Sequence, residues 1–157
     1  VVTMCRERGL HIAVGESCTG GLVGARITAV PGSSVVFVGG VIAYEDRVKV
    51  EMLGVSREVL AEHGAVSEPV VRQLASGART RLGAEIGIGV SGGAGPGGGS
   101  PEKPVGTVWT AVAVEGTVTA YRRGYPGDRE EIRARSAQMA LDMVRSALDG
   151  SAGRSRA

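Results

Sequence analysis

Aromatic residues, cysteines and lysines are all scarce in this chain. Among its 157 residues, aromatic side chains make up 3%, and there are two cysteines. So few rings argue against a β-sandwich and against a nucleic-acid module that stacks bases on aromatic side chains. Cys5 and Cys18 form no C-x-x-C pair, and His11 and His63 lie far from each other in the sequence. We therefore expect reduced thiols, no zinc site and no disulfide framework.

Long hydrophobic runs and an excess of one charge are also missing. The longest apolar stretch, residues 35–44, is about half of the roughly 20 residues that a membrane span needs, and residues 1–4 show no signal-peptide pattern. The 18 basic and 16 acidic residues leave a net charge of +2, which is a mixed surface. We expect a soluble, cytoplasmic protein with no membrane partner and no direct contact with nucleic acid.

Glycine, by contrast, is abundant, with 26 residues, and the apolar pattern alternates between strand and helix periods. The length fits one domain over residues 1–148, followed by a short flexible tail over residues 149–157. The pattern predicts strands at 11–14, 38–44, 85–90, 105–114 and 117–121, and helices at 1–8, 22–30, 45–53, 56–62, 67–82 and 128–148. Strands separated by helices, with one hairpin, indicate an α/β fold: a three-layer α/β/α domain with a mixed, mostly parallel sheet.

Three polar or glycine-rich segments follow predicted strands, at residues 16–21, 44–49 and 91–100. Ligands of such folds bind at the carboxyl ends of strands, so these segments are candidates for a common site. The sequence G-x-G-x-x-G at 87–92 lies inside a strand and leads into no helix, which excludes a dinucleotide-binding turn. The run at 91–100 is either a flexible surface loop or, because nearby prolines restrict it, a shaped ligand-binding loop.

The first of these segments resembles a nucleophile elbow. Gly15-Glu16-Ser17-Cys18-Thr19 is one residue short of the G-x-S-x-G pattern and lies between a predicted strand and a predicted helix. Ser17 is therefore a candidate nucleophile. The alternative is that Ser17 or Thr19 only caps the helix. Cys18 is either a rival nucleophile or a small buried hydrophobic residue.

Two cations are candidates for chemistry or binding. Lys49 is one of two lysines in a chain that otherwise uses arginine, and only lysine can lose its proton and act as a general base. The alternative interpretation is that Lys49 is a solvated surface lysine. Arg129 begins the last predicted helix, where a phosphate could bind. The alternative interpretation is that Arg129 forms an exposed ion pair with Glu130 or Glu131.

Taken together and in order, these motifs resemble the C-terminal domain of the competence/damage-inducible CinA family, the nicotinamide mononucleotide amidohydrolases of the PncC type. The resemblance covers about residues 5–145. It rests on Lys49 and on the following segments: 15–21, 40–44, 53–55, 63–68, 91–100, 102–108 and 127–129. This chain has Gly93 where the family commonly has Ile, and Glu45-Asp46 where it often has Ser-Asn.

The resemblance implies hydrolysis of the carboxamide of nicotinamide mononucleotide to nicotinic acid mononucleotide and ammonia, with no cofactor and no metal. It also implies a homo-oligomer, most simply a dimer. We expect Ser17 to attack the amide carbon, Lys49 to take its proton, and Tyr44 and Ser91 to orient the reacting groups. The expected oxyanion donors are the backbone amides of Cys18, Thr19 and Gly20. The expected substrate contacts are Glu16, Gly92, Gly95, Arg129 and Lys103. Two alternatives stay open: a non-catalytic nucleotide-binding or protein-interaction module linked to competence and DNA damage, and an amidase that uses the Cys18 thiol.

Overall fold

Five strands form one sheet in the order β2-β1-β3-β4-β5. In this computed structural model, which describes residues 1–152, the strands are β1 (Ile12–Glu16), β2 (Phe37–Ile42), β3 (Ile86–Gly92), β4 (Thr107–Val114) and β5 (Thr117–Gly124). β1 pairs in parallel with β2 and β3, whereas β4 is antiparallel to both β3 and β5. The α/β/α prediction is confirmed. The prediction of a mostly parallel sheet holds for strand direction, because only β4 runs opposite to the other four strands. It does not hold for the strand pairings, because two of them are parallel and two are antiparallel.

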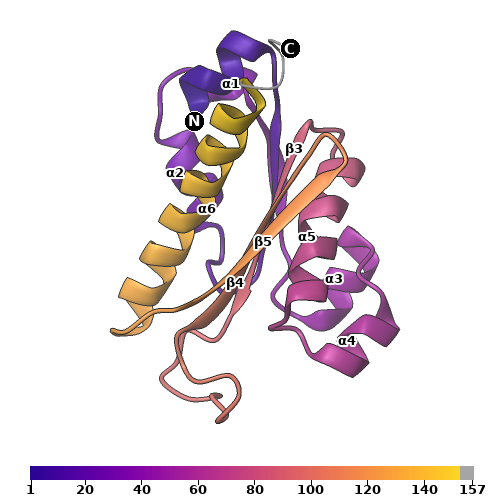
Figure 1. Cartoon of the computed structure of the whole chain (residues 1–157), viewed down its shortest axis with the longest axis vertical. Helices are drawn as coiled ribbons and strands as arrows, with labels where there is room; N and C mark the ends of the chain where they lie inside the picture. Colours follow the sequence, from indigo (N-terminus) through magenta and orange to yellow (C-terminus); the bar gives the residue numbers. More distant parts are fainter. Residues whose placement is uncertain (153–157) are drawn as a thin grey trace.

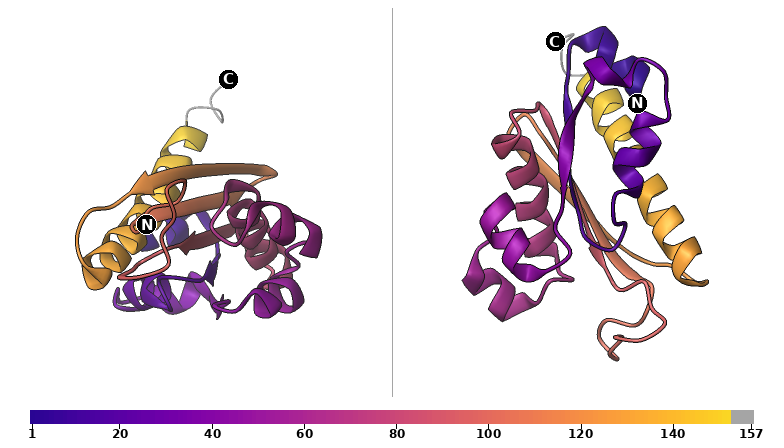
Figure 2. Two further views of the ribbon diagram at one scale, coloured as in Figure 1. Left: turned by 90° about the horizontal axis from the view of Figure 1, so that it is seen from below. Right: turned by 180° about the vertical axis from the view of Figure 1, so that it is seen from behind.

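Helices cover both faces of this sheet, as Figures 1 and 2 show. One layer contains α1 (Val2–Arg8), α2 (Leu22–Thr28) and α6 (Arg129–Ala152). The other contains α3 (Asp46–Leu53), α4 (Arg57–His63) and α5 (Glu68–Arg81), and a 3₁₀ turn at Ser33–Val35 precedes β2. Alternation along β1 divides the core, because Ile12 and Val14 pack with the first layer and Ala13 packs with the second.

Of the α-helices, α4 and α6 begin with a side-chain cap from the preceding residue, Ser56 and Asp128 respectively. The Asp128 carboxylate accepts a hydrogen bond from the Glu131 amide at 2.9 Å, and Glu131 accepts one from the Asp128 amide at 3.0 Å. This reciprocal pair starts α6. Ser67 precedes α5 in the position and residue type that favour a cap, but its hydroxyl donates to the carbonyl of Gly64 and accepts no bond from the helix.

α6 continues to Ala152, beyond its predicted end at residue 148. The first residues of the predicted flexible tail therefore belong to this helix, and residues 153–157 lie outside the described part of the chain. No helix within residues 1–152 is both long enough and apolar enough to cross a membrane.

The glycines of the rejected G-x-G-x-x-G pattern have a packing role. A Cβ atom at Gly87 would lie 2.0 Å from the carbonyl oxygen of Ala75, and one at Gly89 would lie 2.5 Å from that of Val71. Both contacts are with the backbone of α5. The missing side chains thus let α5 pack directly on β3, at the centre of the sheet.

The carboxyl ends of β1, β2 and β3 meet at one end of the molecule. The three strands are parallel to one another, and their registers place Glu16 beside both Ile42 and Val90. The glycine-rich loop between β3 and β4 projects from this end, and α6 begins beside it, whereas the N-terminus and the last turns of α6 lie at the opposite end (Figure 1). The three candidate segments therefore converge, as the sequence predicted.

Candidate functional site

Ser17 directly follows β1, between the ends of its two neighbouring strands. Its amide donates to the carbonyl of Val90 at 2.9 Å, and the carbonyl of Glu16 accepts from Ala43 at 2.7 Å. The Ser17 side chain is 8% exposed, and its hydroxyl has no hydrogen-bond partner among residues 1–152. Ser17 is therefore in a buried position with an uncommitted nucleophilic oxygen.

Glu16 takes the capping role that the sequence offered to Ser17 or Thr19. Its buried carboxylate accepts hydrogen bonds from the amides of Gly21, Val23 and Gly24 at 2.9–3.1 Å. These amides form the start of α2, whose N-cap residue provides no side-chain hydrogen bond of its own. The alternative that Ser17 or Thr19 caps α2 is therefore wrong. The predicted contact of Glu16 with substrate remains a prediction, and both of its oxygens already have partners.

Lys49 lies in the helical layer that packs on the strand end preceding Ser17. A Cβ atom at Gly15 would lie 2.8 Å from the Cδ1 atom of Leu53, so Gly15 faces α3. Glu16 points the other way, to α2, whose first amides it binds. Lys49 precedes Leu53 by one helical turn on the same face of α3. The fold thus places the candidate base on the α3 side of β1, the strand that the candidate nucleophile directly follows.

The environment of Lys49 excludes the surface alternative. This side chain is 1% exposed. Its Nζ atom donates to the Tyr44 carbonyl and to the Asp46 carboxylate, each at 2.9 Å. An ammonium group has three donors, so these two bonds leave one direction open. Sequence reasoning missed Asp46, although its i, i+3 spacing from Lys49 was visible.

The turn after β1 holds the three amides that were expected to form an oxyanion hole. The Gly20 amide is occupied, because it donates to the Ser17 carbonyl at 3.1 Å. The amides of Cys18 and Thr19 donate to no oxygen atom among the described residues, and both lie close to the Cys18 sulfur. The candidate donors are thereby reduced from three to two.

A residue that the sequence did not single out binds this turn from α6. Arg133 donates from Nε to the Cys18 carbonyl at 3.1 Å and from Nη2 to the Thr19 carbonyl at 2.9 Å. The sequence separation is more than 100 residues, so no local motif could have revealed the contact. Its i, i+4 spacing from Arg129 was the one available signal, because it places both residues on one helix face.

Cys18 is a buried thiol within the core. Burial raises the pKa of this thiol from its ordinary 9.0 to about 11. The nearby amides of Cys18 and Thr19 and the guanidinium of Arg133 act against this shift without cancelling it. A thiol that stays protonated at neutral pH is a poor nucleophile, which disfavours Cys18 as a rival to Ser17.

Arg129, at the start of α6, binds the segments that follow β2 and β3. Its guanidinium donates to the Gly95 carbonyl at 2.7 Å and to the Tyr44 hydroxyl at 3.3 Å. The alternative of an exposed ion pair with Glu130 or Glu131 is wrong, because Arg129 forms no salt bridge among the described residues. The fold therefore brings together three of the residues predicted from separate motifs.

Ser91 and Lys103 fix the borders of the glycine-rich loop. The Ser91 hydroxyl is buried and donates to the Ala65 carbonyl at 2.8 Å, and Lys103 Nζ donates to the His63 carbonyl at 2.7 Å. Gly92 is packed against β4, where a Cβ atom would lie 2.6 Å from a methyl carbon of Val108. This anchoring favours a shaped loop. The catalytic role of Ser91 remains a prediction.

Three cations at this end of the molecule have no carboxylate partner in the described chain, in contrast to Lys49, which is paired with Asp46. Arg129, Arg133 and Lys103 all donate to carbonyl or hydroxyl oxygens, and within residues 1–152 none of them is paired with a carboxylate. Elsewhere most ion pairs are formed between neighbouring residues of one helix. Uncompensated cations around a buried serine favour an anionic ligand.

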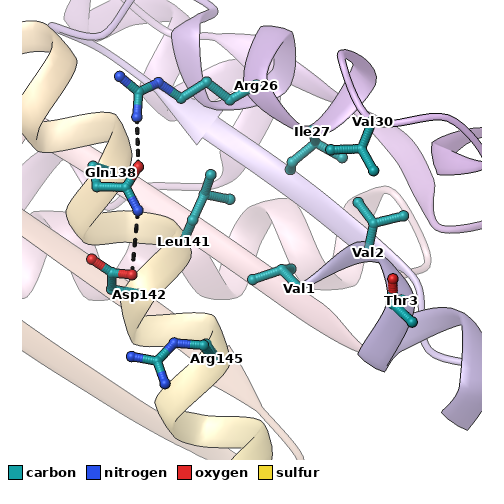
Figure 3. A pocket seen from close by; sticks show the side chains of 10 residues that line it. All are labelled: Val1, Val2, Thr3, Arg26, Ile27, Val30, Gln138, Leu141, Asp142 and Arg145. Carbon is teal, nitrogen blue, oxygen red and sulfur yellow. Dashed lines mark hydrogen bonds between the residues drawn. The ribbon is translucent and has the colours of Figure 1, made fainter.

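Two other features lie outside this site. A pocket of about 320 Å³ lies between α1, α2 and α6, but no predicted catalytic or binding residue lines it (Figure 3). Its polar lining consists largely of side chains that bond one another, Arg26 with Gln138 and Gln138 with Asp142. In the part of the chain that the structure describes, no cluster of three or more His, Cys, Asp or Glu is arranged to hold a metal ion.

Comparison with known proteins gives consistent matches along the chain. The family model for the CinA C-terminal domain matches residues 1–148. A CinA-like protein of Gemmatimonas aurantiaca is 58% identical over 98% of this chain and 36% of that protein. One of Akkermansia muciniphila is 54% identical over 90% of this chain and 34% of its own length. The chain thus spans about a third of the length of these curated relatives.

Solved structures match in fold as well. The competence/damage inducible protein CihA from Agrobacterium tumefaciens has a TM-score of 0.91 and 41% identity, covering 94% of this chain and 90% of that one. The competence damage-inducible protein A from Klebsiella pneumoniae has a TM-score of 0.90 and 37% identity, covering 94% and 91%.

Proposed function

Since the chain belongs to the family of CinA C-terminal domains, we propose that it hydrolyses the carboxamide of nicotinamide mononucleotide. The products are nicotinic acid mononucleotide and ammonia, as a step of cytoplasmic pyridine-nucleotide recycling. One observation supports the proposal beyond the resemblance: a fully buried lysine lies in the layer that packs on β1, and a serine whose hydroxyl has no partner among the described residues directly follows that strand. Such a pair suits a serine nucleophile activated by a lysine base.

The first half of the reaction acylates the serine. Ser17 Oγ attacks the carbonyl carbon, and Nζ of Lys49, acting as the general base, takes its proton. The negative charge that develops on the carbonyl oxygen is bound by the amides of Cys18 and Thr19. Lys49 then delivers the proton to the amide nitrogen, the C–N bond breaks, and ammonia leaves.

The second half returns the enzyme to its starting state. Water attacks the acyl carbon, its proton passes to Lys49, and the Ser17 oxygen leaves with a proton as the ester bond breaks. The carboxylic acid product is released. Asp46 and the Tyr44 carbonyl hold Nζ in place through both halves, because they accept the two hydrogen bonds that Nζ donates and leave its third position for proton transfer.

The phosphate of the substrate suits the uncompensated cations of the site. Arg129 lies between Tyr44 and the glycine-rich loop, and its two bonds are to neutral oxygens that a phosphate can replace. Lys103 lies at the far border of the same loop and is the second candidate. We assign the phosphate to Arg129. A KM for the mononucleotide that is unchanged in Arg129→Ala would remove that assignment.

The test is ammonia release by the purified protein from nicotinamide mononucleotide, with free nicotinamide and glutamine assayed in parallel. Turnover of the mononucleotide alone supports the substrate, and Ser17→Ala should reduce its kcat by at least about a thousandfold. Full turnover in Ser17→Ala or Lys49→Ala would refute the serine–lysine pair.

A folded wild-type protein that is silent on all three substrates would instead favour the non-catalytic alternative, a nucleotide-binding or protein-interaction module. The predicted homodimer is a separate proposal. Light scattering coupled to size-exclusion chromatography checks it, and a monomeric mass would refute it.

A further inference from the structure

Arg133 is placed to control the turn that carries the nucleophile. It lies on α6 one helical turn after Arg129, and its guanidinium binds two consecutive carbonyls, those of Cys18 and Thr19. The Thr19 side chain does not hold the turn, because its buried hydroxyl has no partner among the described residues. The two bonds from Arg133 therefore tie the turn to α6.

These bonds also determine where the Thr19 amide points. The cis peptide bond of the described chain is Gly95–Pro96, so the bond between Cys18 and Thr19 is trans. In a trans peptide the C=O and the following N–H point in opposite directions. Holding the Cys18 carbonyl toward α6 thus turns the Thr19 N–H away from α6, and this N–H donates to no oxygen atom within residues 1–152, where its neighbour is the weakly accepting Cys18 sulfur.

The charge of Arg133 acts on the same peptide unit. A guanidinium that binds a carbonyl polarises the peptide, so its N–H becomes a stronger donor. The next peptide unit differs, because its Gly20 amide is already bonded to the Ser17 carbonyl. The effect is thereby concentrated on Thr19.

We propose that Arg133 is a positioning residue that orients and polarises the Thr19 amide as an oxyanion donor for the reaction at Ser17. The inference rests on the proposed amidase function. It assigns Arg133 no contact with substrate, and so it separates the two arginines of one helix face: Arg129 for binding and Arg133 for the rate.

The test compares Arg133→Met, Arg133→Gln and Arg133→Lys with wild type in steady-state hydrolysis of nicotinamide mononucleotide. Arg133→Met should lower kcat about 30- to 100-fold with KM unchanged within about twofold, which is less than the full loss of an oxyanion donor because the amide is displaced and not removed. Arg133→Lys should recover part of the rate because it keeps the charge. Arg133→Gln, a neutral donor, should recover less.

Arg145→Met is the matched control, since this arginine lies on the same helix and pairs with Asp149. It should leave kcat unchanged. Amide hydrogen exchange provides a second measurement: the Gly20 amide, which is bonded to the Ser17 carbonyl within the turn, should exchange at least about tenfold faster in Arg133→Met than in Arg145→Met.

If the wild type hydrolyses the mononucleotide and a folded Arg133→Met has the same kcat, the inference is overturned and the proposed function stands. Equal losses in Arg133→Met and Arg145→Met would also overturn it, because they would show a general disturbance of α6. If wild type itself fails to hydrolyse the mononucleotide, the proposed function fails in its own assay and the role of Arg133 in catalysis fails with it.

Discussion

The buried thiol of Cys18 gives a prediction that tests both the packing of the turn and the identity of the nucleophile. Burial raises the pKa of this thiol from 9.0 to about 11 in the folded protein. At pH 8 the thiolate fraction therefore falls from about 10% for an unperturbed thiol to about 0.1%. We expect iodoacetamide to react with Cys18 at least about a hundredfold more slowly in the folded protein than in urea.

The same shift predicts how stability changes with pH. In the unfolded chain the thiol loses its proton near pH 9, whereas the fold retains the proton until about pH 11. The stabilisation is therefore fully present below pH 9 and is lost as the pH rises toward 11. Between pH 8 and pH 11, the free energy of unfolding of wild type should fall by about 2 kcal/mol more than that of Cys18→Ala.

Urea unfolding of both proteins at several pH values measures this difference. Cys5 and Tyr125 also have pKa values raised by burial. Cys5 cancels in the comparison, whereas Tyr125 leaves a smaller contribution, because the charge of Cys18 is the smallest of the causes that raise its pKa. Parallel pH dependence of the two proteins, with alkylation at the rate of a free thiol, would refute the reasoning. Loss of ammonia release in Cys18→Ala would show that the thiol takes part in the reaction.

Three further predictions concern stability. Gly89→Ala should lower the free energy of unfolding by at least about 2 kcal/mol, because its Cβ would lie 2.5 and 2.7 Å from two backbone atoms of α5. Gly93→Ala meets nothing within 4 Å and should raise it by up to about 1 kcal/mol; urea titration of both variants checks this, and equal effects would contradict it. Asp128→Ala should cost about 1 kcal/mol through loss of the α6 cap, seen as a lower Tm; an unchanged Tm would show that the cap adds nothing. Lys49→Met should abolish ammonia release while leaving the free energy of unfolding unchanged or raised by up to about 2 kcal/mol, because an apolar side chain replaces a buried charge; a large loss of stability in calorimetry would indicate a structural lysine.

Most elements of the fold follow from local patterns. The hairpin is predicted by Glu115-Gly116 between two apolar segments, and both turn residues have the positive φ that this tight turn requires. α6 is predicted from Asp128 and Glu131. The predicted end of α6 at residue 148 is wrong because Gly150 is typical of a residue that follows a helix. In the structure Gly150 lies within α6.

The candidate site was predicted only in part. Sequence placed Ser17, Tyr44 and Ser91 at strand ends, and the parallel registers of β1, β2 and β3 bring those ends together. The sequence offered Ser17 or Thr19 as a possible cap of α2 and did not reveal Glu16 in that role, because the carboxylate reaches the α2 amides only through the folded turn.

By itself, the sequence determined the elements, the strand ends on which the site is built, and the residue types available there. Periodicity, caps and turns act over a few residues, and a single chain displays them directly. Only the tertiary structure decided that Lys49 is buried, that the Cys18 thiol is held protonated, and that Arg133 binds the turn after β1. These properties depend on desolvation and on contacts between residues distant in the chain, which exist only once the sheet and its helices are packed.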